Sequence, residues 1–281
     1  MSTQSLELRE VPGPSALGGG TRRALELLYV IAVTDFKRTY FGTVLGYVWS
    51  VARPLLMFAV LLEVFTHVFH FASKVHHYPV FLLFDVVLFG FFQEATLGAV
   101  GSIVAHESIV RKTQFPRLVI PLAVVLTTLF NFALNLVVAF IFVLAFGISP
   151  AASWLLMIPV LLAILVFTGA VSMMLSALFP RFRDVGIIWT VLSTALFYAT
   201  PVLYPIVAPS QHLRDVIALN PLAPLFDLAQ RAVTDPQAPW PGSAAAGGPW
   251  RLAVAIGLYV VVCVLAVVIF RREAPRIAEE L

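Results

Sequence analysis

The chain has 281 residues, of which 60% are hydrophobic and only 12% carry a charged side chain. Soluble domains hold about 25% charged residues, so this composition excludes an ordinary water-soluble globular protein and favours a protein embedded in lipid. The single cysteine, Cys263, excludes a disulfide framework within the chain, and the net charge of +3 is too small to indicate a nucleic-acid partner.

The N-terminal part of the chain is predicted to lie outside the membrane core. Residues 1–20 have no apolar core, so we expect a disordered cytoplasmic tail and no cleavable signal peptide. Residues 21–47 place apolar side chains at helical spacing among basic ones, which predicts an amphipathic helix at the membrane interface. A surface helix of a small cytoplasmic cap is the alternative.

Six apolar runs are long enough to cross a hydrocarbon layer of roughly 30 Å, which requires about 18 residues or more. They cover residues 48–71, 78–104, 122–146, 154–178, 186–203 and 252–270. The first run contains Glu63 and the second contains Asp85 and Glu94, which is acceptable if these carboxyl groups face protein or water. The sequence therefore predicts an all-α integral membrane protein with six transmembrane helices.

The basic residues predict the orientation of these spans. An even number of spans places both termini on the same side. Only Lys74, Arg214, Arg231 and Arg251 fall on the opposite side, which leaves 14 of the 18 basic residues on the side of the termini. The positive-inside rule then predicts that both termini, including the tail at 273–281, are cytoplasmic.

Two connecting segments have features of their own. Between the second and third spans, residues 107–115 can form about two helical turns before Pro116, with apolar and basic side chains suited to docking. An ordinary basic loop is the alternative.

Between the fifth and sixth spans, prolines interrupt residues 199–250, and two short helices are predicted near 213–219 and 225–233. Because non-helical backbone at membrane depth must be buried or line a watery cavity, we expect a re-entrant element at the outer mouth of a pathway.

The motifs of several enzyme classes are missing from the sequence. It contains no P-loop, no G-x-S-x-G elbow and no H-E-x-x-H metal motif, so no catalytic residue and no cofactor are assigned to this chain. His67, His70, His76 and His77 gather near the outer end of the first span, where a metal site and a wet interface are both compatible with imidazoles. Aromatic residues are abundant in the spans, which fits lipid contact or stacking on sugar rings.

Particular strings then indicate a family. The run at 38–57 closely resembles the start of the first span in ABC-2 type permeases that export polysaccharides such as O-antigen, teichoic acid or galactan. The same family has a coupling helix that ends in Phe-Pro, as at Phe115-Pro116, and an Arg-Asp pair before the fifth span, as at 183–184. A Pro-Val-x-Tyr-Pro turn at 201–205 and an Asn-Pro-Leu at 220–222 follow in the same order. His106 departs from the Asn that related sequences commonly have.

This resemblance implies a permease subunit without catalytic activity of its own, whose six-span domain covers residues 48–272. Two copies would enclose a channel and bind two copies of a separate ATPase subunit, which would hold ATP and Mg²⁺. The complex would move lipid-linked polysaccharide from the cytoplasm across the bacterial inner membrane, in contact with membrane lipid.

The resemblance and the positions of the residues also assign candidate roles. Coupling to the ATPase would involve Glu107, Ser108, Ile109, Val110, Arg111, Lys112 and Phe115. The phosphate of the lipid carrier would meet the basic residues Lys37, Arg38 and Arg53 at the cytoplasmic entrance. The aromatic candidates for the channel are Tyr40, Tyr47, Trp49, Trp189, Tyr198 and Tyr204. The outer gate would comprise Pro201, Tyr204, Pro205, Asn220 and Pro221.

Three other functions remain open at this point. An ABC-2 permease for a drug or small lipid would share the six-span plan. A membrane-embedded glycosyl or acyl transferase would need a catalytic acid or histidine. A proton-coupled carrier would use the intramembrane acids Glu63, Asp85 and Glu94, which could equally form buried ion pairs.

Overall fold

The computed structural model describes residues 21–40, 46–68, 70, 77–107, 116–204, 210–234 and 248–275, and these residues form helices and turns without any strand. The predicted all-α class is therefore confirmed. The tail predicted at 1–20 lies outside the described residues, as do residues 276–281 of the tail predicted at 273–281 and the link between the first two helices at 41–45.

Among the residues that the structure describes, five helices are long and apolar enough to cross a membrane. They are α2 (Gly46–His67), α3 (Tyr78–Val100), α6 (Val119–Ala145), α7 (Met157–Leu178, continuing the 3₁₀ turn η2 at Ala152–Leu156) and α11 (Pro249–Glu273). The sixth apolar segment, α8 (Val185–Ala199), has 15 residues. At 1.5 Å per residue it is about 22 Å long, which is shorter than a typical hydrocarbon core.

The end of α8 differs from the prediction of a span reaching residue 203. Thr200 has φ −94° and ψ 143°, so the helix ends at Ala199. The physical reason is Pro201, because the proline ring disfavours helical backbone in the residue that precedes it. The predicted second span is also divided, since α3 ends at Val100 and a separate turn, α4 (Ser102–Ala105), follows it.

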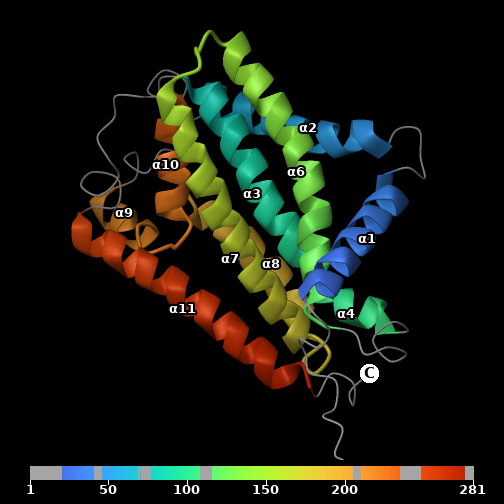
Figure 1. The fold of residues 1–281 in the computed structure, drawn as a ribbon. Coiled ribbons are helices and arrows are strands. Elements are labelled where there is room, and N and C mark those ends of the chain that lie inside the picture. The colour runs from blue at the N-terminus through green and yellow to red at the C-terminus, as the bar shows by residue number, and fades with distance from the viewer. Residues whose placement is uncertain are drawn as a thin grey trace, which may run out of the picture.

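Helix α1 (Thr21–Tyr40) lies outside the bundle of spans and packs on α6, as Figure 1 shows. The Phe36 ring meets the edge of Phe130 at 5.6 Å, and Thr127 Oγ1 donates a hydrogen bond of 3.1 Å to the carbonyl of Ala32. The opposite face exposes Val30, which lies two residues before the buried Ala32. One face of α1 is therefore buried and the other is free, which is the arrangement expected of an interface helix.

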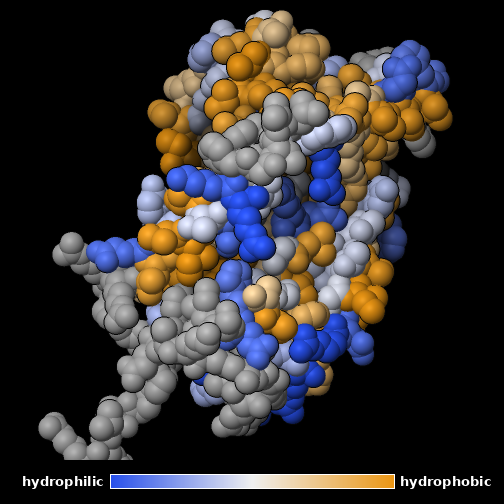
Figure 2. All heavy atoms as spheres, turned by 90° about the vertical axis from the view of Figure 1, so that its right-hand side faces the viewer, coloured by the Kyte–Doolittle hydropathy of each residue, from blue (hydrophilic) through white to orange (hydrophobic). Residues whose placement is uncertain are grey.

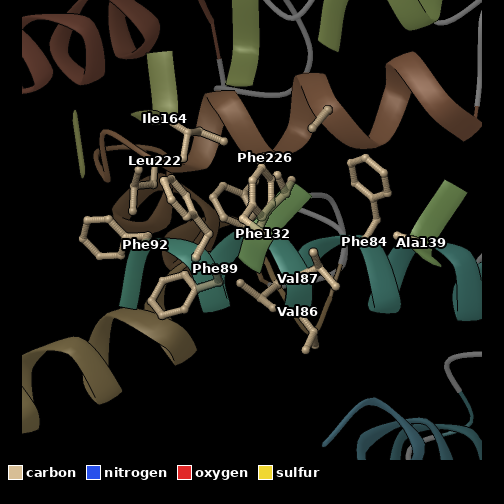
Figure 3. Close-up of a cluster of buried hydrophobic side chains, with 14 of the residues drawn as sticks. Phe84, Val86, Val87, Phe89, Phe92, Phe132, Ala139, Ile164, Leu222 and Phe226 are labelled. Atoms are coloured by element: carbon tan, nitrogen blue, oxygen red, sulfur yellow. The ribbon is translucent and has the colours of Figure 1, made fainter. Parts of the chain in front are cut away.

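Helix α3 forms the centre of the molecule, enclosed by α2, α6, α7, α8 and the short helix α10 (Ala223–Thr234). Figure 3 shows how its phenylalanines fill the interior together with apolar side chains from the surrounding helices. Phe89 packs 5.2 Å from Phe197 of α8 and 6.3 Å from Phe226 of α10. By contrast, α2 crosses α3 and α6 at a steep angle in Figure 1 and is largely exposed.

The connecting segments separate toward two ends of the bundle. At one end Ile103, Ile120, Ala177 and Phe270 form a small cluster, which joins the ends of α4, α6, α7 and α11. At the other end Tyr78 donates a hydrogen bond of 2.9 Å to the carbonyl of Leu203. Arg181, between α7 and α8, shares the first of these ends with the last turn of α11, since its guanidinium lies 3.6 Å from the carboxylate of Glu273.

Candidate functional site

A cavity of about 710 Å³ lies between the start of α2 and the facing sides of α3 and α6. Its size falls within the range of about 300–1,000 Å³ that is usual for ligand sites. Its polar lining includes Arg53, Gln93, Glu94, Asn131 and Asn135. Figure 2 faces this side of the molecule and shows hydrophilic residues at a hollow between hydrophobic surfaces.

Glu94 and two asparagines form a continuous hydrogen-bonded row along the cavity. Asn131 Nδ2 donates to the two carboxylate oxygens of Glu94 at 3.2 and 3.4 Å. One turn further along α6, Asn135 Nδ2 donates to the backbone carbonyl of Asn131 at 3.0 Å. Polar groups at this depth are costly in lipid, so a row of them indicates a functional surface.

Pro54 explains how α2 joins this row. Proline lacks the N–H that would bond to the carbonyl four residues earlier, so the helix leaves the carbonyl of Ser50 without its usual donor. Asn135 Nδ2 lies 3.4 Å from that oxygen and donates to it. A side chain from a neighbouring helix therefore replaces the missing backbone hydrogen bond, as membrane helices with internal prolines require.

The predicted entrance residues are placed in two groups. Arg53 lines the cavity, together with the channel candidate Trp49, whose side chain is 60% exposed. Lys37 and Arg38 are exposed in the last turn of α1, and the adjacent Thr39 reaches the cavity. Their contact with a lipid phosphate stays a prediction.

The other aromatic candidates occupy contrasting environments. Trp189 is buried and packs 6.2 Å from Phe92, so within one chain it belongs to the core. Tyr198 is 60% exposed on α8. The side chains of Tyr40 and Tyr47 lie outside the described residues. A channel role for these residues stays a prediction.

The predicted outer-gate residues lie together at the end of α8. Asn220 Nδ2 donates to Thr200 Oγ1 at 2.9 Å, and its Oδ1 accepts the N–H of Leu222 at 3.0 Å across Pro221. The hydroxyl of Tyr204 donates to the carbonyl of Tyr198 at 2.8 Å. Pro205 lies outside the described residues. The structure brings these segments together, while their action as a gate stays a prediction.

A further polar junction at this end was not predicted from the sequence. Gln230 Nε2 on α10 donates to Asp85 Oδ2 of α3 at 2.7 Å and to the carbonyl of Pro201 at 2.9 Å. Asp85 is seven residues into α3, so Gln230 of α10 meets α3 about 10 Å from the start of that helix. The re-entrant character of this region stays a prediction. The sequence indicated Asp85 as an acid within a span, but not its partner Gln230, which lies on a short helix 145 residues away.

Asp227 and Glu63 each contact a basic side chain one turn away on their own helix. Arg231 Nε lies 2.8 Å from Asp227 Oδ2 within α10. Burial raises the pKa of Asp227, and the neighbouring Arg231 guanidinium partly counteracts that rise. Glu63 lies on the exposed side of α2 beside His67, whose Nδ1 is 3.2 Å from Glu63 Oε1. The three intramembrane acids therefore occupy three different environments rather than one chain of neighbours.

The histidines and the coupling segment are only partly described. Within the described ranges, no group of three or more His, Cys, Asp or Glu residues is placed to hold a metal ion, and His76 lies outside them. Of the predicted coupling residues the structure describes Glu107. The others lie outside the described residues: Ser108, Ile109, Val110, Arg111, Lys112 and Phe115. His106 Nε2 is 3.8 Å from Asp35 Oδ2, so the start of the segment is held near α1.

Comparison with known proteins identifies the class to which this bundle belongs. Residues 26–233 match the ABC-2 type transporter family, and the chain is a member of that family. It is 34% identical over 203 residues to the O-antigen export system permease protein RfbA of Klebsiella pneumoniae, covering 72% of this chain and 77% of that protein. The RfbA protein of Myxococcus xanthus is 32% identical, covering 71% and 77%. The polysialic acid transport protein KpsM of Escherichia coli is 25% identical, covering 70% and 77%.

Proposed function

We propose that this chain is the permease subunit of an ATP-driven exporter that moves lipid-linked polysaccharide out of the cytoplasm. The observation that carries the proposal is the cavity between α2, α3 and α6, which is lined by Trp49 and by the polar row from Glu94 to Asn135. Aromatic faces and hydrogen-bonding side chains are the two groups that recognise sugars. The names of the relatives, O-antigen export and polysialic acid transport, favour the same class of substrate.

The proposed exporter also contains ATPase subunits and a second copy of the permease. The sequence has no P-loop, so ATP and Mg²⁺ would be bound by two copies of a separate ATPase subunit. These subunits would dock on the segment at 107–115, beside the basic connections at the cytoplasmic end. A second copy of the permease would complete the channel, and the complex would lie in the bacterial inner membrane with both termini in the cytoplasm.

Deletion of the gene tests this function directly. Cells lacking the permease should accumulate a lipid-linked glycan on the cytoplasmic leaflet and lose the same glycan from their surface, as measured by extraction and mass spectrometry. Deletion of the ATPase gene should give the same intermediate, and the complementing wild-type gene should remove it. Normal surface glycan in the deletion strain, or accumulation of a drug or small lipid instead, would contradict the proposal.

A further inference from the structure

A groove of about 420 Å³ lies between α1, α6, α7 and α11, away from the cavity described above. In Figure 1, α1 and α11 lie on the two sides of the pair formed by α6 and α7. Leu28 of α1 lines the groove together with a stripe on α6, which consists of Leu122, Val125, Leu126 and Leu129. These α6 residues have the spacing of one helix face, so the groove follows that helix for about two turns.

Small residues of α7 form the floor of the groove. Gly169 and Ala170 are buried there, and a Cβ added to Gly169 would lie 3.8 Å from Leu122 Cδ2, in ordinary contact. At the rim, Val166 of α7 and Val267 of α11 are 51% and 40% exposed. The groove is therefore continuous with the exposed apolar surface of the spans. An empty hollow there would lose the dispersion contacts of its lining, so hydrocarbon fills it.

The groove lies in one half of the spans. Leu122 is the fourth residue of α6, and Val267 is six residues before the end of α11. Both positions are near the helix ends that the cluster containing Ile120 and Phe270 joins. The positive-inside rule predicts that this end is cytoplasmic. From Leu122 to Leu129 the groove extends about 10 Å toward the middle of the bundle, which is within the depth of one leaflet.

Arg271 of α11 places a positive charge beside the cytoplasmic end of the groove. It lies one helical turn beyond Val267, on the same side of the helix. Its side chain is exposed, and among the described residues no ion pair involves it. Glu273, two residues further on, is 3.6 Å from Arg181 instead. A long basic side chain at this level can reach the phosphate of a lipid headgroup while its stem stays in hydrocarbon.

We infer that the groove between α1, α6, α7 and α11 binds one acyl chain of an anionic phospholipid from the cytoplasmic leaflet, with the headgroup phosphate at Arg271. The apolar lining selects a hydrocarbon chain, and the arginine selects a negative headgroup. The bound chain joins α1 to α11 across α6 and α7. This site is separate from the polar cavity and from Lys37 and Arg38 at the other end of α1, so the inference goes beyond the proposed function.

Native mass spectrometry tests the binding of lipid directly. The full chain is purified in a mild detergent with the subunits that accompany it, and is then given equal amounts of dioleoyl phosphatidylglycerol and dioleoyl phosphatidylcholine. These lipids have the same acyl chains and differ in headgroup charge. We expect one retained phosphatidylglycerol per permease chain, favoured about fivefold over phosphatidylcholine. Retention of neither lipid, as when a second copy covers the groove, or of both equally would overturn the inference.

Groove-filling substitutions locate the site. Ala170→Leu on the floor and Val166→Trp at the rim should each remove most of the retained phosphatidylglycerol, because the larger side chains occupy the space of the acyl chain. Either variant suffices, provided that it elutes like the wild type in gel filtration. Leu162→Trp is the matched control, since Leu162 is one turn from Val166 on α7, is 59% exposed and lies outside the lining. Retention in the groove variants, or equal loss in the control, would contradict this location.

Two arginine variants test the headgroup contact. Arg271→Gln should reduce the preference for phosphatidylglycerol about fivefold, to near equality with phosphatidylcholine, because the charge beside the phosphate is lost. Arg272→Gln removes the same charge from the same turn, but its side chain points about 100° further round the helix. It should therefore leave most of the preference. Equal effects of the two variants would indicate a general attraction between charges and would overturn the assignment of the phosphate to Arg271.

Competition distinguishes a membrane phospholipid from the lipid carrier of the glycan. Polyprenyl phosphate also has a phosphate and a hydrocarbon chain, but its methyl branches make the chain wider than a groove with a tightly packed floor accommodates. We expect phosphatidylglycerol to stay bound in the presence of an equal amount of polyprenyl phosphate. Its displacement would assign the groove to the carrier and overturn the inference. The export of a glycan is tested separately by the deletion strain, so the proposed function stands or fails independently.

Discussion

Individual polar residues inside the spans are satisfied by partners from distant parts of the chain. Asn135 donates to the Ser50 carbonyl that Pro54 leaves without a helical donor, and Gln230 donates both to Asp85 and to the Pro201 carbonyl. Each of these hydrogen bonds joins two different elements, because the lipid offers no water as a substitute partner. Loss of one donor therefore leaves buried acceptors without a partner.

The two hydrogen bonds of Gln230 predict a contribution of this side chain to thermal stability. Gln230→Ala leaves a buried carboxyl oxygen and a buried carbonyl without their donor, at a cost of about 2 kcal/mol, and should lower the Tm in detergent by roughly 4–8 °C. Asp85→Asn retains an acceptor for Gln230 and should lower it less. Tm is measured by intrinsic fluorescence on heating. An unchanged Tm in Gln230→Ala would show that the junction between α10 and α3 contributes no stability.

At the scale of elements, short segments decide where each span ends. Pro201 ends α8 four residues earlier than its apolar pattern predicts, and Gly101 separates α3 from the turn of α4. The α4 turn then leads into the coupling segment, and the contact between His106 and Asp35 holds its start beside α1. A movement of the coupling segment would therefore be transmitted both to α1 and to the spans.

The coupling segment gives a prediction at the element scale. The double substitution Arg111→Glu/Lys112→Glu, or Phe115→Asp, should reduce co-purification of the ATPase by about tenfold or more, because the first reverses two charged docking groups and the second removes an apolar one. Membrane insertion should be unaffected. The matched control is Arg271→Glu/Arg272→Glu, which reverses two exposed charges at the same end of the bundle. Equal losses in both double variants would indicate a general effect of charge and no specific docking.

At the scale of the whole molecule, the basic connections and the proline-rich segment lie at opposite ends of the bundle. Phe182, between α7 and α8, and Leu213, in α9 (Gln211–Ile217), are 51% and 50% exposed at these two ends. They are therefore matched reporters for the orientation of the chain in the membrane. The positive-inside rule predicts that Phe182 faces the cytoplasm.

Cysteine labelling in intact cells tests this orientation. In a Cys263→Ala background, an impermeant maleimide should label Leu213→Cys from outside the inner membrane and label Phe182→Cys only after the membrane is opened. Labelling is read by the mass shift of the purified chain. The reverse pattern would place the basic end outside and would exclude docking of a cytoplasmic ATPase there.

The sequence by itself determined the membrane class, the approximate positions of the spans and the membership of a permease family. These properties depend on the length and polarity of local runs, such as the apolar run within 252–270, and on the order of strings such as 38–57. It also identified Trp49, Arg53 and Glu94 as residues of interest. It did not indicate Asn131, Asn135 or Gln230, because an amide in a span has no distinctive local pattern.

The tertiary structure alone decided which of these residues meet. Trp49, Arg53 and Glu94 line one cavity with the two asparagines, while Trp189 packs in the core and Glu63 faces outward. The low charge content that first excluded a soluble protein thus leaves few polar groups in the spans, and their positions define the site. The physical reason is that hydrogen bonds act over about 3 Å, so residues separated by 37 to 145 positions become partners only when the helices pack.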